Sequence, residues 1–124
     1  MDAERLKALF EPFGLVTVRR MFGGHGVYIE GLCFAIEHAG EVFLKADAES
    51  APGFAAAGSS PFISNARGKA VPTSFWRLPS VALDDATELT RWAVLGLEEA
   101  RRAAADKAKP RKERPAKGKR AGGA

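Results

Sequence analysis

A short glycine-rich run at residues 23–26, with the sequence GGHG, is the part of the chain that most readily suggests chemistry. Clustered backbone amides in such a run can hold an anion, as they do in phosphate-binding loops. A nucleotide loop, however, leads from a strand into a helix and supplies a Lys-Ser or Lys-Thr pair, whereas this run leads into the strand-like sequence VYI. We therefore interpret it as a structural turn and expect no cofactor there.

Histidine and cysteine are the other residues with obvious chemistry, and the chain holds only His25, His38 and Cys33. They are too few and too scattered for a metal site of recognisable spacing. His25 could act as a general base, but no Ser, Cys or carboxylate lies at a spacing that would complete a catalytic group. We expect no metal and no enzymatic activity; an enzyme using the glycine turn, with His25 and Lys45 as its polar groups, is the less favoured alternative.

Two consecutive arginines precede the glycine turn, and clustered cations of this kind can bind a phosphate backbone or an acidic partner. Because side chains alternate along a strand, Arg19 and Arg20 should point to opposite faces, and at least one should form an ordinary salt bridge. The expected carboxylate partners are Glu30, Glu37 and Asp47. The candidate binding residues in the folded part are Arg19, Arg20, His25 and Lys45.

The C-terminal segment is strongly basic, with eight Lys or Arg against Asp106 and Glu113 in residues 106–124, a net charge of +6. Such a segment can displace counterions from nucleic acid, but it has no aromatic residue to stack on a base, so we expect at most weak, nonspecific attraction. Its candidate binding residues are Lys107, Lys109, Arg111, Lys112, Arg114, Lys117, Lys119 and Arg120.

The distribution of apolar residues predicts one domain followed by a tail. Large apolar side chains stop at Leu97, so we place a folded domain at residues 1–105 and a disordered Lys/Arg/Ala/Gly/Pro tail at 106–124. Residues 1–105 carry 11 basic and 13 acidic side chains, so the folded part is nearly neutral. The single cysteine excludes an internal disulfide, and no apolar stretch resembles a membrane span, which together favour a reduced, cytoplasmic protein.

Hydrophobic periodicity predicts an α+β domain built on an antiparallel sheet. Apolar spacing favours a first helix within residues 2–13 that ends near Phe10, because Pro12 follows, and a short helix at 52–57. The last helix should be capped by Asp84 or Asp85 and bury a stripe from Leu89 to Ala100. Alternating segments predict strands at 15–21, 26–30, 32–37, 41–46, 62–65 and 71–78.

Within the predicted sheet, alternation assigns side chains to faces. One face of the strand at 32–37 should carry Leu32, Phe34 and Ile36, and Val42 and Leu44 of the next strand should pack beside them on the same face. The turns that connect these strands, at 30–31 and 39–40, each end in glycine, which is typical of tight hairpins.

Residues 19–28, with the sequence RRMFGGHGVY, closely resemble the signature of the N-terminal domain of the TfoX/Sxy competence-regulator family. The resemblance continues at 43–47, at 54–62, at 74–79 and around Trp92, and covers roughly residues 6–104. The residues that carry the signature are Met21, Phe22, Gly23, Gly24, Gly26 and Tyr28.

This resemblance implies a fold similar to the YjbR-like and secretion-chaperone-like group, in the order helix, three strands, helix, two strands, helix. The periodicity adds a short extra strand before the glycine turn. Longer family members regulate natural competence by promoting transcription of DNA-uptake genes and carry a second, helical domain. We expect a single-domain member, monomeric or homodimeric, that binds a protein partner away from membranes; a nonspecific nucleic-acid-associated protein acting through its tail is the alternative.

Overall fold

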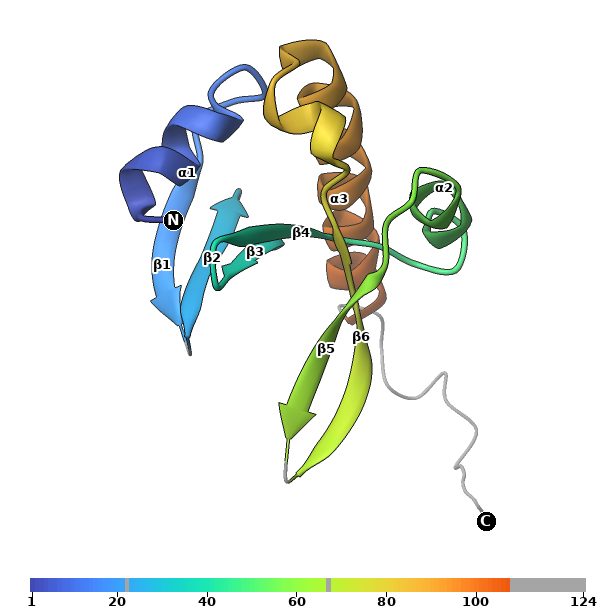
Figure 1. Ribbon diagram of the computed structural model, residues 1–124. Helices are drawn as coiled ribbons and strands as arrows, with labels where there is room; N and C mark the ends of the chain where they lie inside the picture. The colour runs from blue at the N-terminus through green and yellow to red at the C-terminus, as the bar shows by residue number, and fades with distance from the viewer. Residues whose placement is uncertain (22, 67, 108–124) are drawn as a thin grey trace.

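The computed structural model describes residues 1–21, 23–66 and 68–107, in which a group of four strands and a hairpin of two are separated and flanked by helices (Figure 1). The phenylalanine of the glycine-turn signature, Phe22, and the tail from residue 108 onward lie outside the described residues. The elements are α1 (Ala3–Phe10), β1 (Thr17–Met21), β2 (Gly24–Ile29), β3 (Leu32–His38), β4 (Glu41–Lys45), α2 (Ala51–Ala56), β5 (Pro61–Ala66), β6 (Lys69–Arg77), the 3-10 helix η1 (Ser80–Leu83) and α3 (Ala86–Lys107).

The strands form one antiparallel sheet in the order β1-β2-β3-β4-β6-β5. The first four are consecutive neighbours because both turns predicted to be tight are two residues long, with positive φ at Glu30 and Gly31 and again at Ala39 and Gly40. After β4 the chain forms α2 and then β5, but the strand that pairs with β4 is β6, and β5 lies at the edge of the sheet beyond β6. Figure 1 shows the β5–β6 hairpin extending well beyond the rest of the sheet.

The helices cover one face of this sheet. Helix α3 lies across β3 and β4 and also contacts α1, while Phe54 of α2 packs on Trp92 of α3 with ring centroids 4.7 Å apart. Both longer helices begin at an aspartate: Asp2 accepts a hydrogen bond from the backbone N–H of Arg5, and Asp85 accepts from those of Thr87 and Glu88. Of the two predicted caps, Asp84 and Asp85, the structure uses Asp85, and the buried stripe that follows it is as predicted.

The α+β fold around an antiparallel sheet is confirmed, with differences of detail. The extra strand that the periodicity predicted before the glycine run is present as β1, so four strands, not the three that the resemblance implies, precede α2 among the described residues. The interpretation of residues 23–26 as a turn is wrong for most of the run, because Gly24, His25 and Gly26 pair with β1 and β3 as the start of β2. Helix α3 continues to Lys107 and thus includes two residues that were assigned to the disordered tail. No helix among the described residues is both long enough and apolar enough to cross a membrane.

One predicted face assignment is wrong. Val27 pairs with Ala35 but Tyr28 pairs with Cys33, so Phe34 is the extra residue of a β-bulge. The bulge resets the alternation: Phe34 and Ala35 are both fully buried in the core, and Ile36 lies opposite Phe43 on the other face. Leu32 and Phe34 therefore contact the core, as do Val42 and Leu44, but Ile36 does not share their face.

Candidate functional site

The face of the sheet opposite the helices, called here the open face, carries a row of aromatic and cationic side chains across several strands. The Arg19 guanidinium lies 5.4 Å from the centroid of the Tyr28 ring, and Lys45 Nζ lies 5.2 Å from that of Phe75. Tyr28 pairs with Cys33 between these two contacts, and Tyr28, Cys33 and Lys45 line one hollow that also reaches the last turns of α3, at Ala100, Ala103, Ala104 and Lys107. The row therefore runs Arg19, Tyr28, Cys33, Lys45, Phe75, from β1 to β6.

A second hollow on the open face lies between β1–β3 and the β5–β6 hairpin. It has a volume of about 310 Å³. Its apolar lining residues are Met21, Ile36, Phe62 and Phe75, and its polar ones are Glu37, His38, Ser64, Thr73 and Ser74. His38, which also lines this hollow, contacts Phe62 with ring centroids 5.2 Å apart. The size is at the lower end of the range for small-ligand pockets, and the lining suits a flat apolar group.

Cys33 in the aromatic row is a poor candidate for a nucleophile. Burial is the main influence on its thiol and raises its pKa, and Sγ donates a hydrogen bond to the carbonyl of Ala35 at 3.4 Å. Since the thiolate is the reactive species, this cysteine serves as a small packing residue.

The other two sequence candidates, Arg20 and His25, lie on the helix side of the sheet. They line a hollow with Met1 and Glu37 at the start of α1. His25 Nδ1 donates to Glu37 Oε1 at 2.7 Å, and the N-terminal ammonium lies 3.5 Å from Glu37 Oε2. Burial raises the pKa of Glu37, but hydrogen bonds from His25 and Gly40 and the nearby ammonium outweigh it, so its pKa is lowered overall.

The sequence did not indicate that Glu37 is the carboxylate partner of His25. The two are 12 positions apart, but they are directly opposite one another in the β2–β3 register. Only the correct strand register could have indicated this pair. Of the described residues that line the hollow, none carries a hydroxyl or thiol that the imidazole could activate.

The predicted salt bridges of Arg19 and Arg20 with three named carboxylates are wrong. Glu30 binds Arg101 at 2.7 Å, Asp47 binds Arg102 at 2.9 Å, and Glu37 binds His25. The cations of α3 reach the first two because this helix packs across the sheet. The expectation that Arg19 and Arg20 face opposite sides is met, since Arg19 lies over Tyr28 and Arg20 lines the hollow beside His25.

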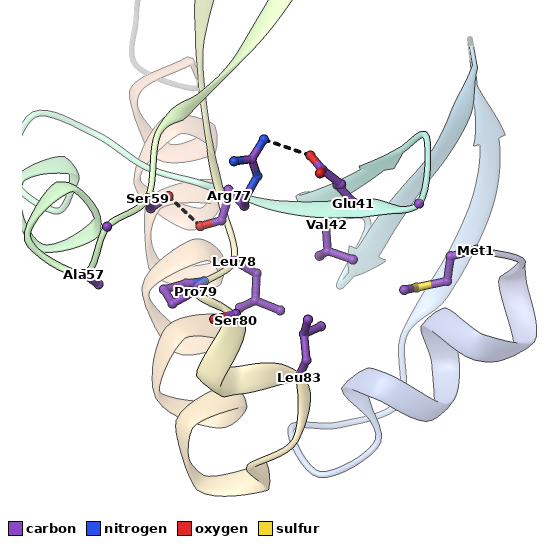
Figure 2. A pocket seen from close by; sticks show the side chains of 12 residues that line it. Met1, Glu41, Val42, Ala57, Ser59, Arg77, Leu78, Pro79, Ser80 and Leu83 are labelled. Atoms are coloured by element: carbon purple, nitrogen blue, oxygen red, sulfur yellow. Dashed lines mark hydrogen bonds and ion pairs between the residues drawn. The ribbon is translucent and has the colours of Figure 1, made fainter.

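A further hollow of about 280 Å³ lies between the N-terminus, β4 and η1, with Val42, Leu78 and Leu83 turned into it (Figure 2). Its polar groups are engaged by the protein: Ser59 Oγ donates to the carbonyl of Arg77, and the guanidinium of Arg77 binds Glu41 at 2.9 Å. It offers no arrangement of reactive groups. Over the parts of the chain that the structure describes, no three His, Cys, Asp or Glu gather as a metal site would need.

Comparison with known families agrees with the resemblance seen in residues 19–28. A family model described as the TfoX N-terminal domain matches residues 8–100. The chain belongs to this family. The match begins at the end of α1 and stops within α3, so the TfoX N-terminal domain includes every strand of the described sheet. No curated protein matches the chain significantly.

The signature of the TfoX N-terminal domain has a clear structural role at β2. Gly24 lies so close to the Glu37 carbonyl of β3 that there is no room for a side chain. A Cβ at Gly26 would lie 2.9 Å from the Tyr28 ring and 3.2 Å from Met21 Sδ. The glycines therefore let Tyr28 lie across β2 on the open face, close to Met21.

Proposed function

We propose that this TfoX N-terminal domain protein is a non-enzymatic regulator of competence or transcription that acts by binding a macromolecular partner through its open face. The family supports a competence-related role. The observation that carries the binding surface is the placement of the described α-helices on one side of the sheet, which leaves the aromatic and cationic row on the other side without a helical layer: Arg19 is exposed, and Tyr28, Lys45 and Phe75 are half-buried.

The composition of the open face supports a binding role. Met21 on the edge strand β1 is 43% exposed, and Ile36, Phe62 and Phe75 are only partly buried. A sheet face that serves only as a solvated surface is usually polar, with apolar residues confined to the covered side. Contiguous exposed apolar side chains with polar groups at their rim are typical of an interaction site.

The polar clusters elsewhere in the molecule support the non-enzymatic part of the proposal. The His25–Glu37 pair resembles half of a catalytic group, but Glu37 is also held by Gly40 and the N-terminal ammonium. These contacts attach the start of α1 to the β2–β3 pair. They give Glu37 a structural role that requires no substrate.

The test places a charge on the open face without disturbing the core. In a strain that lacks the native gene, Met21→Glu should fail to restore transcription of DNA-uptake genes and transformation frequency, whereas the intact chain should restore both. The matched control is Leu15→Glu, which adds the same charge at a side chain that is 94% exposed before β1. It should behave as the intact chain does.

Two results would count against the proposal. One is full activity of Met21→Glu, with circular dichroism confirming that both variants are folded. The other is a gene deletion that leaves transcription and transformation unchanged.

A further inference from the structure

We infer that the macromolecule bound by the open face is a single-stranded nucleic acid, with bases against its aromatic residues and phosphates against its cations. This inference rests on the proposed function and names the chemical class of the partner. This surface could not be inferred from the family match or from the composition of the tail, because residues from five strands form it.

Rings and cations alternate along the row. Arg19 accompanies Tyr28, Lys45 accompanies Phe75, and Arg77 lies 5.7 Å from the buried Phe43 ring. Because Phe43 is buried and Arg77 is paired with Glu41, the contacts available to a strand are the two at Tyr28 and Phe75. Proteins that bind single strands combine aromatic platforms for bases with cations along the backbone, and Arg also stacks on bases.

The hollow beside the row has matching chemistry. Its apolar lining by Ile36, Phe62 and Phe75 suits the face of a base, and the imidazole of His38, which also lines it, can bind a polar base edge. A volume of about 310 Å³ with an open side admits a flat ring while its sugar and phosphate remain in solvent.

The end of α3 brings further positive charge to the same place. Lys107 lines the hollow that also contains Tyr28, Cys33 and Lys45, so the helix ends beside the aromatic row. Seven Lys or Arg and one Glu follow Lys107 in the sequence. Charge of this density favours a polyanion as the partner, and a nucleic acid strand carries one phosphate at every nucleotide.

Other partners match the face less well. A duplex buries its base faces, so the rings of the row would have nothing to stack on. An acidic protein segment would satisfy the cations but does not present a flat ring at successive positions. A single strand uses both the rings and the cations.

The test measures the binding of a fluorescent oligothymidylate of about 20 nucleotides to the full chain by anisotropy. The variant Arg19→Gln/Lys45→Gln should weaken binding at least about tenfold at roughly 0.05 M salt, since both cations lie in the row. The control Lys7→Gln/Arg91→Gln removes the same charge from two exposed helical positions and should change affinity less than about twofold.

Cross-linking locates the strand on the protein. An oligonucleotide containing 5-bromodeoxyuridine should cross-link, on irradiation, to the tryptic peptide 21–45, which contains Tyr28. A duplex of the same length, at equal concentration, should compete poorly.

Three outcomes would overturn the inference. The first is equal binding by the row variant and its control, with cross-links confined to residues beyond Lys107, which would assign binding to the tail alone. The second is stronger binding of the duplex. The third is no oligonucleotide binding at about 0.05 M salt; if Met21→Glu nevertheless abolishes regulation, the proposed function stands with a protein as the partner.

Discussion

At the scale of single residues, Glu37 is the clearest example of a polar group whose environment is set by tertiary contacts. Its side chain is only 4% exposed, and its carboxylate accepts hydrogen bonds from His25 and from the backbone N–H of Gly40. A buried carboxylate without such partners would be strongly unfavourable, so these contacts are required for Glu37 to remain ionised.

The lowered pKa of Glu37 predicts a pH dependence of stability. The native state favours the ionised carboxylate, so its contribution is complete above the ordinary value of 4.5 and is lost as the pH falls through the lower native value. Glu37→Gln should reduce the free energy of unfolding by about 1–3 kcal/mol at neutral pH and flatten its decline below 4.5. Urea denaturation between neutral and acidic pH measures both effects.

The control for this prediction is Glu4→Gln, which alters a carboxylate on α1 that is 86% exposed. It should leave the acid dependence of the intact chain in place. An unchanged acid profile for Glu37→Gln would contradict the assigned role of the His25–Glu37 pair.

At the scale of elements, the close approach of α3 to the sheet depends on Gly96. A Cβ at this position would lie 2.9 Å from the carbonyl oxygen of Phe34 and 3.4 Å from a methyl group of Leu44. The first of these atoms is backbone in β3 and cannot move without shifting the bulge. The glycine therefore allows the helix to contact β3 and β4 directly.

We predict that Gly96→Ala lowers the free energy of unfolding by about 1–3 kcal/mol, despite the higher helix propensity of alanine, because the added methyl group overpacks the interface. The control Gly53→Ala lies in α2, where a Cβ meets nothing within 4 Å. That variant should gain up to about 1 kcal/mol. Thermal unfolding of both variants measures the difference, and a stabilised Gly96→Ala would show that α3 can move away from β3.

At the scale of the whole molecule, stability and charge come from different parts of the chain. The buried core extends from Leu6 to Ala100. The seven Lys or Arg and Glu113 beyond Lys107 change the formal charge of the chain from −2 to +4. The tail therefore determines the net charge without supplying any large apolar residue to the core.

We predict that removing residues 108–124 changes the free energy of unfolding by less than about 0.5 kcal/mol, because the removed segment contains no large apolar side chain. Chemical denaturation of the full and shortened chains at equal salt measures this. A loss of several kcal/mol would show that the segment packs on the domain.

Local sequence patterns determined most of the elements of this protein. The cap at Asp85, the two-residue turns at Gly31 and Gly40, and the opposite directions of Arg19 and Arg20 all depend on neighbours within a few positions. Chain-local geometry is enough to specify such features, since a helix cap or a hairpin turn involves only adjacent backbone groups.

Tertiary structure alone decided which distant side chains meet. The pairing of His25 with Glu37 required the β2–β3 register, and the position of Ile36 required a bulge at Phe34 that reverses the alternation. The strand register brings Tyr28, Lys45 and Phe75 into one row, and the helices of the described residues pack on the other side of the sheet. Such contacts join strands far apart in the chain, so their physical cause is the packing of the whole sheet rather than any local pattern of residues.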